Sequence, residues 1–206
     1  NPFAFALVNR DDKYGDTMLL NCKAKKISYG ITRESDIKAR VLESHIGGTL
    51  ISINQRECWL KVIGDFNVYN VCAVYGAAIQ LGMTADEALQ RISALNPVSG
   101  RFQKIEGPNG ITGIVDYAHT PDALEKVLSS LIKFRKPPQR IITIVGCGGD
   151  RDKGKRPQMA SIASRLSDYV ILTSDNPRSE SAEKILKDME SGLKKSDKKK
   201  KMFKRA

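Results

Sequence analysis

The 206-residue sequence predicts an α/β protein that ends in a Rossmann-like, doubly wound parallel sheet. From Ile111 onward, a short run rich in β-branched residues is followed by an amphipathic helical pattern three times in succession. The run RIITIV at 140–145 has almost no polar side chain, which is typical of a strand covered on both faces. Before residue 100 the pattern differs, because short strands precede two helices.

The first part of the chain predicts several short strands and then two helices. A turn is expected at 11–15, and strand-like segments lie at 2–9, 18–20, 26–31, 49–53 and 58–63. Residues 66–81 are apolar on almost every side and end at Gly82, as a buried helix does. Thr84 and Glu87 form a capping box, which predicts the start of a second helix.

The pattern changes after the loop at 96–100, so we expect one domain at 1–99 and a second at 100–206. In the second domain, Thr120 caps a helix whose first position is Pro121. The three strands are expected at 111–117, 140–145 and 169–174, and the three helices around 121–132, 157–166 and 182–189.

Three polar loops follow these strands. They read DYAHTP at 116–121, GCGGDRDKGKRP at 146–157 and SDNPR at 174–178. The carboxyl ends of parallel strands meet at one edge of a sheet, where ligands of open α/β sheets bind. The sequence therefore predicts a ligand site built from these three loops.

The second loop is close to a phosphate-binding loop. From Gly149 it follows the pattern G-x-x-x-x-G-K-[ST] until Arg156, which replaces the hydroxyl residue that would bind magnesium. Two aspartates in the loop would also repel a triphosphate. A surface loop with solvated charges is the alternative interpretation.

The loops offer the side chains that a zwitterionic ligand such as an amino acid needs. A guanidinium group binds a carboxylate through two parallel hydrogen bonds, and a carboxylate accepts hydrogen bonds from an ammonium group. The candidate residues are Arg151, Asp175, Asn176 and Arg178. Arg178 could equally be a surface arginine at a turn, Asp116 could hold a ribose or cap the next helix, and His119 could have no special role.

Composition limits the other classes of function. The formal charge is +11, but residues 191–206 carry +7 of it, which leaves +4 for the other 190 residues. A short lysine cluster at a chain end is more often a solvated helix face or frayed tail than a nucleic-acid surface. Four dispersed cysteines and two histidines argue against a zinc site or a disulfide scaffold and favour a reducing cytoplasm. No apolar stretch approaches the roughly 20 residues that a membrane helix needs.

Five motifs in this order resemble the Mur ligases of bacterial cell-wall synthesis, and most closely the type that extends UDP-N-acetylmuramoyl-L-alanyl-D-glutamate. They are FNVYN at 66–70, GRF at 100–102, DYAHTPDAL at 116–124, GCGGDRDKGKRP at 146–157 and SDNPRSE at 174–180. The resemblance implies that 1–99 is the latter portion of a central ATP-binding domain. It also implies that 100–206 is an incomplete Rossmann-like C-terminal domain.

The resemblance implies an ATP- and Mg²⁺-dependent synthesis of an amide bond through an acyl phosphate. The implied nucleotide-side residues are Asn67, Asn70, Arg101, Asp116 and His119, with Asp116 at the ribose and His119 near the adenine. The implied amino-acid site is the set of four residues named above, and Lys153 resembles the family's lysine near the transferred phosphate. No metal ligand is expected in this chain.

The resemblance also bears on the substrates. Arg178 favours meso-diaminopimelate over L-lysine, because the second carboxylate of diaminopimelate would pair with it. A lysine-adding ligase, a folate-type ligase of the same superfamily, a non-catalytic amino-acid-binding module and a basic nucleic-acid-binding protein remain alternatives. Gln103 stands where the family has glutamate. We expect a fragment of a longer, monomeric, cytoplasmic ligase that is inactive alone, because no true phosphate loop and no UDP-sugar domain are recognised.

Overall fold

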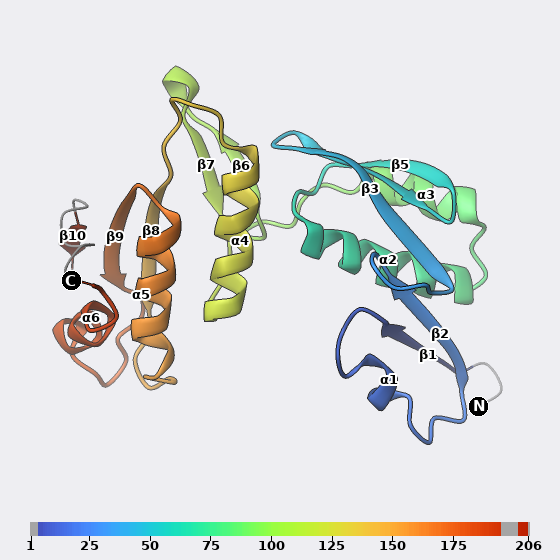
Figure 1. The fold of residues 1–206 in the computed structure, drawn as a ribbon, viewed down its shortest axis with the longest axis horizontal. Coiled ribbons are helices and arrows are strands. Elements are labelled where there is room, and N and C mark those ends of the chain that lie inside the picture. The colour runs from blue at the N-terminus through green and yellow to red at the C-terminus, as the bar shows by residue number, and fades with distance from the viewer. Residues whose placement is uncertain (1–3, 195–201, 206) are drawn as a thin grey trace. The chain divides into compact units, whose positions relative to one another are not determined.

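The computed structural model describes residues 4–194 and 202–205. Its contacts divide the chain into two compact units, Asn1–Val115 and Asp116–Ala206, which are described separately (Figure 1). The elements of the first unit are β1 (Phe5–Asn9), α1 (Gly15–Met18), β2 (Lys25–Gly30), β3 (Ile37–His45), β4 (Gly48–Ile53), β5 (Arg56–Leu60), α2 (Asp65–Gln80), α3 (Ala85–Ala94), β6 (Gln103–Glu106), η1 (Pro108–Gly110) and β7 (Thr112–Val115). The elements of the second unit are α4 (Pro121–Phe134), β8 (Ile142–Cys147), α5 (Lys155–Leu166), β9 (Tyr169–Ser174), α6 (Ala182–Glu190) and β10 (Met202–Arg205).

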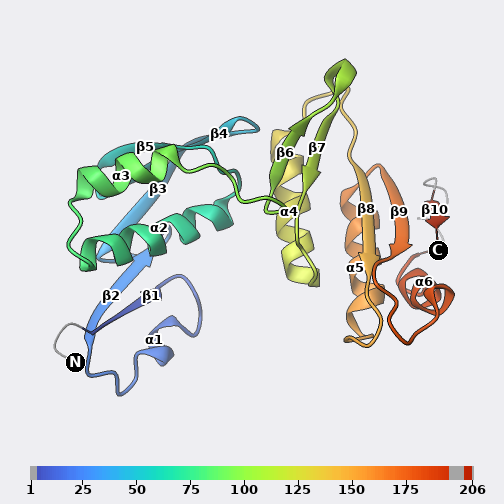
Figure 2. The ribbon, with the colours of Figure 1, turned by 180° about the vertical axis from the view of Figure 1, so that it is seen from behind.

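The first unit is built on a five-stranded sheet in the order β1-β2-β3-β4-β5. The pairs β1–β2 and β2–β3 are parallel, and the pairs β3–β4 and β4–β5 are antiparallel. Helices α2 and α3 run beside this sheet (Figure 2). Its core joins Ile51 and Ile53 of β4 to Cys72 and Tyr75 of α2 and to Leu89 of α3.

Three predictions for the first unit need correction. Residues 18–20 are not a strand, because they follow directly on the short helix α1. Strand β3 was not predicted, since its charged residues Lys38 and Arg40 obscure the alternation of buried Ile37 and Ala39. Helix α2 is not buried on every side, because Val74 is 52% exposed.

The second helix of this unit confirms its prediction. The Thr84 hydroxyl accepts a hydrogen bond from the backbone N–H of Glu87 at 3.3 Å, and the Glu87 carboxylate accepts one from the backbone N–H of Thr84 at 3.3 Å. This reciprocal capping box starts α3 at Ala85. Such hydrogen bonds are local in sequence, which is why the pattern predicts them well.

The second unit contains a three-stranded parallel sheet in the order β10-β9-β8. Helices α4, α5 and α6 share one hydrophobic core with β8 and β9. The side chains of Val145 and Cys147 point into this core, whereas Ile142 and Ile144 are 62% and 70% exposed. Within the described residues, β8 is therefore covered on one face only, and the prediction of a strand buried on both faces is wrong.

Of the three predicted strand and helix pairs, two belong to the parallel sheet. The strand expected from Ile111 is β7, which pairs antiparallel with β6. The turn between them is Pro108-Asn109-Gly110, in which Asn109 and Gly110 have positive φ values of 57° and 74°. A close turn with residues that tolerate a left-handed backbone favours a local hairpin, and this pairing accounts for the difference.

The end of the chain also differs from the prediction. Met202–Arg205 form β10, which pairs in parallel with β9, instead of a helix face or frayed tail. The rest of the lysine cluster, 195–201, lies outside the described residues. The predicted boundary at residue 100 stays a prediction, since the division after Val115 describes compactness alone.

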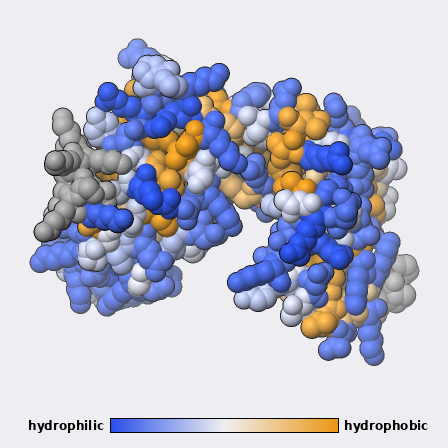
Figure 3. All heavy atoms as spheres, in the orientation of Figure 1, coloured by the Kyte–Doolittle hydropathy of each residue, from blue (hydrophilic) through white to orange (hydrophobic). Residues whose placement is uncertain are grey.

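Hydrophobic side chains reach the surface of both units among a majority of hydrophilic ones (Figure 3). Ile142 and Ile144 of the second unit and Val74 and Leu81 of the first are examples. None of the helices in the described part of the chain combines the length and hydrophobicity that crossing a membrane requires.

Candidate functional site

The loops after β8 and β9 are bound to each other, as the parallel-sheet prediction requires. The backbone N–H of Gly149 donates to the carbonyl of Asn176 at 2.9 Å, and that of Asp175 donates to the carbonyl of Cys147 at 3.1 Å. A Cβ atom on Gly149 would lie 1.8 Å from the carbonyl oxygen of Pro177. Glycine at 149 therefore permits the close approach of the two loops.

Asp150 joins the same two loops through its side chain. Its carboxylate accepts hydrogen bonds from the backbone N–H of Ser179 at 3.1 Å and from the Ser179 hydroxyl at 2.7 Å. These hydrogen bonds lower the pKa of the Asp150 carboxyl group. Asp150 has a positive φ of 52°, and its own N–H donates to Glu180 Oε1 at 2.7 Å.

The side chains of Arg151 and Arg178 both lie near Gly148. A Cβ atom on Gly148 would be 2.8 Å from Nη1 of Arg178 and 4.0 Å from Cγ of Arg151. Nη1 of Arg178 donates to the carbonyl of Gly149 at 2.7 Å. Both side chains are exposed, and that of Arg151 forms no hydrogen bond or ion pair with any described residue. The structure thus brings the two predicted carboxylate-binding arginines together.

Asp175 and Asn176 complete the predicted amino-acid site, and both are exposed. The Asn176 side-chain oxygen accepts a hydrogen bond from the backbone N–H of Arg178 at 3.1 Å, so it supports the turn at 175–178. Asp175 follows directly on β9. The four residues place two guanidinium groups, a carboxylate and an amide at one sheet edge. This set suits a ligand that carries both a carboxylate and an ammonium group.

Arg156 has a different role from the one its position in the phosphate-loop pattern suggests. Its side chain is 0% exposed, although the sequence places it in a charged loop. Nη1 donates to Asp188 Oδ2 at 2.7 Å and to Glu180 Oε2 at 3.0 Å, and Nη2 donates to Glu180 Oε1 at 2.8 Å and to the Gly148 carbonyl at 3.1 Å. Arg156 therefore connects the start of α5 to Gly148 in the second loop, to Glu180 after the third loop and to Asp188 of α6.

Lys153 lies on the exposed side of the second loop. Its Nζ atom is 3.4 Å from Glu180 Oε2, and its side chain is 56% exposed. The hydrogen bonds from Arg156 are the main reason that the pKa of Glu180 is lowered, to about 2. Neither Glu180 nor Ser179 was assigned a role from the sequence, although both belong to the motif SDNPRSE.

The first loop, at 116–121, is bound to the second through Lys155. The Nζ atom of Lys155 donates to the carbonyl oxygen of His119 at 2.8 Å. The exposed His119 ring contacts the Tyr117 ring edge-on, with 5.3 Å between centroids. The Asp116 carboxylate accepts a hydrogen bond from the backbone N–H of Ala118 at 2.8 Å. Because Thr120 is the N-cap of α4, the helix-cap alternative for Asp116 is excluded.

The other three residues that the resemblance assigns to the nucleotide lie in the first unit. Asn67 and Asn70 share one face of α2, where Nδ2 of Asn70 donates to Oδ1 of Asn67 at 3.2 Å. Arg101 is exposed, and it precedes Phe102, which is 2% exposed. The ring of Phe102 packs 6.0 Å from that of Phe66, so this contact holds Arg101 near the first turn of α2.

Gln103, which replaces the family's glutamate, also has a defined place. Its Oε1 atom accepts hydrogen bonds from the backbone N–H of Gly100 at 3.0 Å and from the Ser99 hydroxyl at 3.2 Å. An amide oxygen makes these bonds as a carboxylate oxygen would. Gln103 therefore supports the turn that carries Arg101.

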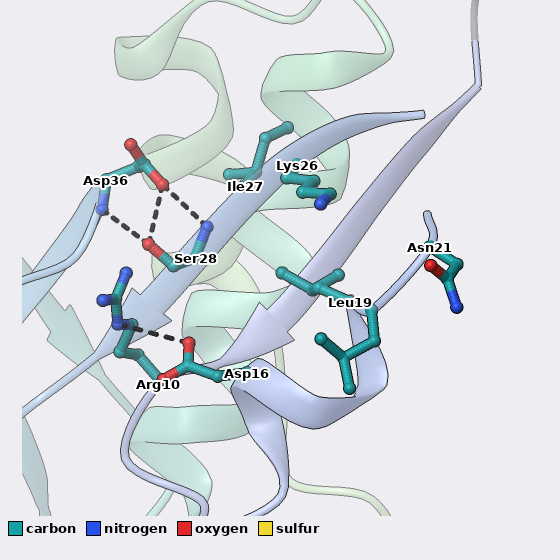
Figure 4. A pocket seen from close by; sticks show the side chains of 9 residues that line it. Arg10, Asp16, Leu19, Asn21, Lys26, Ile27, Ser28 and Asp36 are labelled. Atoms are coloured by element: carbon teal, nitrogen blue, oxygen red, sulfur yellow. Dashed lines mark hydrogen bonds and ion pairs between the residues drawn. The ribbon is translucent and has the colours of Figure 1, made fainter. Parts of the chain in front are cut away.

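A separate pocket lies beside α1 and β2 and contains none of the predicted site residues (Figure 4). Its polar groups largely pair with each other. Asp36 accepts hydrogen bonds from the backbone N–H and the hydroxyl of Ser28, and Arg10 lies 3.6 Å from Asp16. Within residues 4–194 and 202–205, no group of three or more histidine, cysteine, aspartate or glutamate side chains could hold a metal ion.

The chain is an α/β protein in which polar loops meet at the carboxyl edge of a parallel sheet, and two family models match most of its length. The chain belongs to the Mur ligase family: residues 100–206 match the Mur ligase glutamate ligase domain, and residues 1–78 match the Mur ligase middle domain. The resemblance drawn from the five motifs is therefore confirmed.

Particular relatives point to one type within the family. The protein named UDP-N-acetylmuramoyl-L-alanyl-D-glutamate–2,6-diaminopimelate ligase from Parabacteroides distasonis is 54% identical over 193 residues, which are 94% of this chain and 40% of that protein. A solved structure of a ligase with this name is 34% identical, with a TM-score of 0.59, over 98% of this chain and 42% of that one. MurF from Acinetobacter baumannii shares the fold, with a TM-score of 0.75 at 18% identity, over 99% of this chain and 43% of that one. The chain thus spans about two fifths of these proteins.

Proposed function

We propose that this chain is part of an ATP-dependent ligase that joins meso-diaminopimelate to the D-glutamate of UDP-N-acetylmuramoyl-L-alanyl-D-glutamate. Family membership supports an acid–amino-acid ligase, and the names of the relatives support these substrates. The observation that carries the proposal is the pair of exposed arginines beside Gly148. Two guanidinium groups at one sheet edge suit a substrate that carries two carboxylates.

The proposed reaction has two steps. The terminal phosphoryl group of ATP moves to the glutamate carboxylate, which gives ADP and an acyl phosphate. The amine of diaminopimelate then attacks the acyl carbon, so an amide bond forms while inorganic phosphate and a proton leave. Lys153 is proposed to face the transferred phosphoryl group, where its ammonium group would stabilise the developing negative charge.

The amino-acid site would orient the attacking amine. Arg178 and Arg151 would bind carboxylates of diaminopimelate, while Asp175 would accept hydrogen bonds from an ammonium group. The hydrogen bond from Nη1 of Arg178 to the Gly149 carbonyl fixes the guanidinium in place before a ligand arrives, so little conformational freedom is lost on binding. Such positioning is what the second step requires, because it is a reaction between two bound groups.

The nucleotide-side residues are assigned through the family resemblance: Asn67, Asn70, Arg101, Asp116 and His119 would contact ATP. Amide and guanidinium donors suit phosphate and adenine acceptors, and the carboxylate of Asp116 suits ribose hydroxyl groups. No step is assigned to Mg²⁺, because the described residues contain no cluster of metal ligands. A cytoplasmic, monomeric parent enzyme that does not act on nucleic acid is part of the proposal.

A ligase assay of a full-length protein that contains this chain tests the proposal. We expect ADP release and a tripeptide product by mass spectrometry with meso-diaminopimelate, and far less product with L-lysine. Preferential use of lysine would overturn the substrate assignment. The isolated chain is expected to show no turnover, and calorimetry without ATP tells whether it binds diaminopimelate as a module.

A further inference from the structure

Glu180 lies at the centre of an ionic cluster that connects three segments of the second unit. Its Oε1 atom accepts hydrogen bonds from Nη2 of Arg156 at 2.8 Å and from the backbone N–H of Asp150 at 2.7 Å. Its Oε2 atom accepts one from Nη1 of Arg156 at 3.0 Å and lies 3.4 Å from Nζ of Lys153. The Glu180 side chain is only 9% exposed.

Arg156 keeps the Glu180 carboxylate from moving. Its guanidinium is fully buried and is also bound to Asp188 and to the carbonyl of Gly148. A buried charge that loses its partner is costly, so the pair of Arg156 with Glu180 holds one geometry. The position of the carboxylate is thus set from the buried side of the cluster.

Lys153 meets this fixed carboxylate from the exposed side. Its long side chain rotates about several bonds, and its ion pair with Glu180 is the one polar contact of its ammonium group among the described residues. An exposed ion pair contributes little to stability, so its main effect is on where the ammonium group lies. The ammonium has three donors, and those not directed at Glu180 can face a phosphoryl oxygen.

We propose that Glu180, held by Arg156, is a positioning residue that places the Lys153 ammonium group for phosphoryl transfer. This inference rests on the function proposed above. A small displacement of a group that stabilises a transition state can reduce the rate about 100-fold, without a comparable change in substrate binding. Glu180 would therefore act on kcat through Lys153.

A double-mutant cycle in a full-length ligase that contains this chain tests the assignment. The variants are Glu180→Gln, Lys153→Met and the double variant. The matched control is Glu125→Gln, which removes an exposed ion pair between Glu125 of α4 and Arg165 of α5. We expect Glu180→Gln to lower kcat about 10- to 100-fold and to change the KM for diaminopimelate less than about 3-fold. With Lys153→Met already present, it should lower kcat less than about 2-fold further.

The outcomes separate the possible failures. Equal effects of Glu180→Gln with and without Lys153 would show a general structural role and overturn the assignment, as would an unchanged kcat. If circular dichroism shows that Glu180→Gln does not fold, Glu180→Asp keeps the negative charge that Arg156 requires but shifts the carboxylate by about one methylene, and the same cycle applies. An inactive wild-type protein would overturn the proposed function and this assignment with it.

Discussion

Nη1 of Arg178 donates a 2.7 Å hydrogen bond to the carbonyl oxygen of Gly149, so the loop after β9 is fastened to the loop after β8. Arg178 itself has a positive φ of 50°, a backbone conformation that few residues other than glycine adopt. The turn at 175–178 therefore directs the guanidinium toward Gly148 and Arg151. Neither its Nε nor its Nη2 atom has a hydrogen-bond acceptor among the described residues.

The first prediction concerns the substrate that Arg178 is proposed to bind. In a full-length ligase that contains this chain, Arg178→Ala should raise the KM for meso-diaminopimelate about 100-fold or more and leave the KM for ATP within about 2-fold, because a charge-assisted bidentate bond is lost. Steady-state kinetics with each substrate varied in turn measures both. Arg165→Ala, on the exposed face of α5, is the control. Equal losses for both substrates would count against the assignment.

The second prediction contrasts two neighbouring glycines. Gly149→Ala places a Cβ 1.8 Å from the rigid backbone at Pro177, so the loops must separate, and we expect a loss of about 3 kcal/mol in the free energy of unfolding. Gly148→Ala meets the end of the flexible Arg178 side chain at 2.8 Å, so stability should change by less than about 1 kcal/mol. Urea titrations followed by circular dichroism test this order, and equal stabilities would refute it.

Gly148→Ala should still impair the amino-acid site, because the Arg178 guanidinium must move aside. We expect an affinity for diaminopimelate about 10-fold weaker than that of the wild-type chain, by calorimetry, in a protein of nearly wild-type stability. Unchanged affinity would mean that Arg178 can move without loss of function, or that it does not bind the ligand.

Much of the fold follows from patterns that are local in sequence. Strand β9 has the predicted bounds 169–174, and the caps at Thr84 and Thr120 form as expected. The meeting of the second and third loops also follows from the parallel order of strands. These features depend on residues a few positions apart or on the direction of neighbouring strands, which the sequence shows directly.

Contacts between distant residues were less predictable. Arg156 reads as a surface residue, and its burial depends on Glu180 and Asp188, which lie 24 and 32 positions away. Strand β7 pairs with β6 and does not join the parallel sheet as predicted, because a close turn connects β6 and β7. Contacts of this kind depend on the three-dimensional fold, and the spacing of residues in the sequence does not predict them.

The third prediction concerns Asp11, which links the segment after β2 to helix α2. Its carboxylate accepts hydrogen bonds from three consecutive backbone N–H groups at 31–33, from the Thr32 hydroxyl and from the Tyr69 hydroxyl. Partial burial alone would raise the pKa of Asp11, but these hydrogen bonds hold it far below the usual range. Asp11→Asn should cost about 3 kcal/mol, and Tyr69→Phe about 1 kcal/mol.

Trp59 is the single tryptophan and lies in the first unit, so its fluorescence in urea reports this unfolding. Asp12→Asn is the control, because the Asp12 side chain is exposed and, among the residues that the structure describes, accepts a hydrogen bond only from the backbone N–H of Tyr14. Its effect should stay within about 0.5 kcal/mol. A wild-type midpoint for Tyr69→Phe would show that the link between Asp11 and α2 contributes nothing.

The last prediction is a pH dependence that arises from Glu180. The hydrogen bonds from Arg156, with that from the Asp150 N–H, lower its pKa from 4.5 to about 2 in the folded chain. The ionised form therefore stabilises the folded state fully above pH 4.5, and this contribution is lost as the pH falls toward about 2. Circular dichroism of urea unfolding at several pH values should show the free energy of unfolding decreasing in this window, partly through Asp11 as well.

The variant Glu180→Gln should lower the free energy of unfolding near neutral pH and make its decrease with falling pH less steep. Glu34→Gln, whose side chain is 93% exposed, should leave the curve unchanged. A Glu180→Gln curve parallel to that of the wild type would mean that the buried Arg156 cluster does not depend on the charge of Glu180.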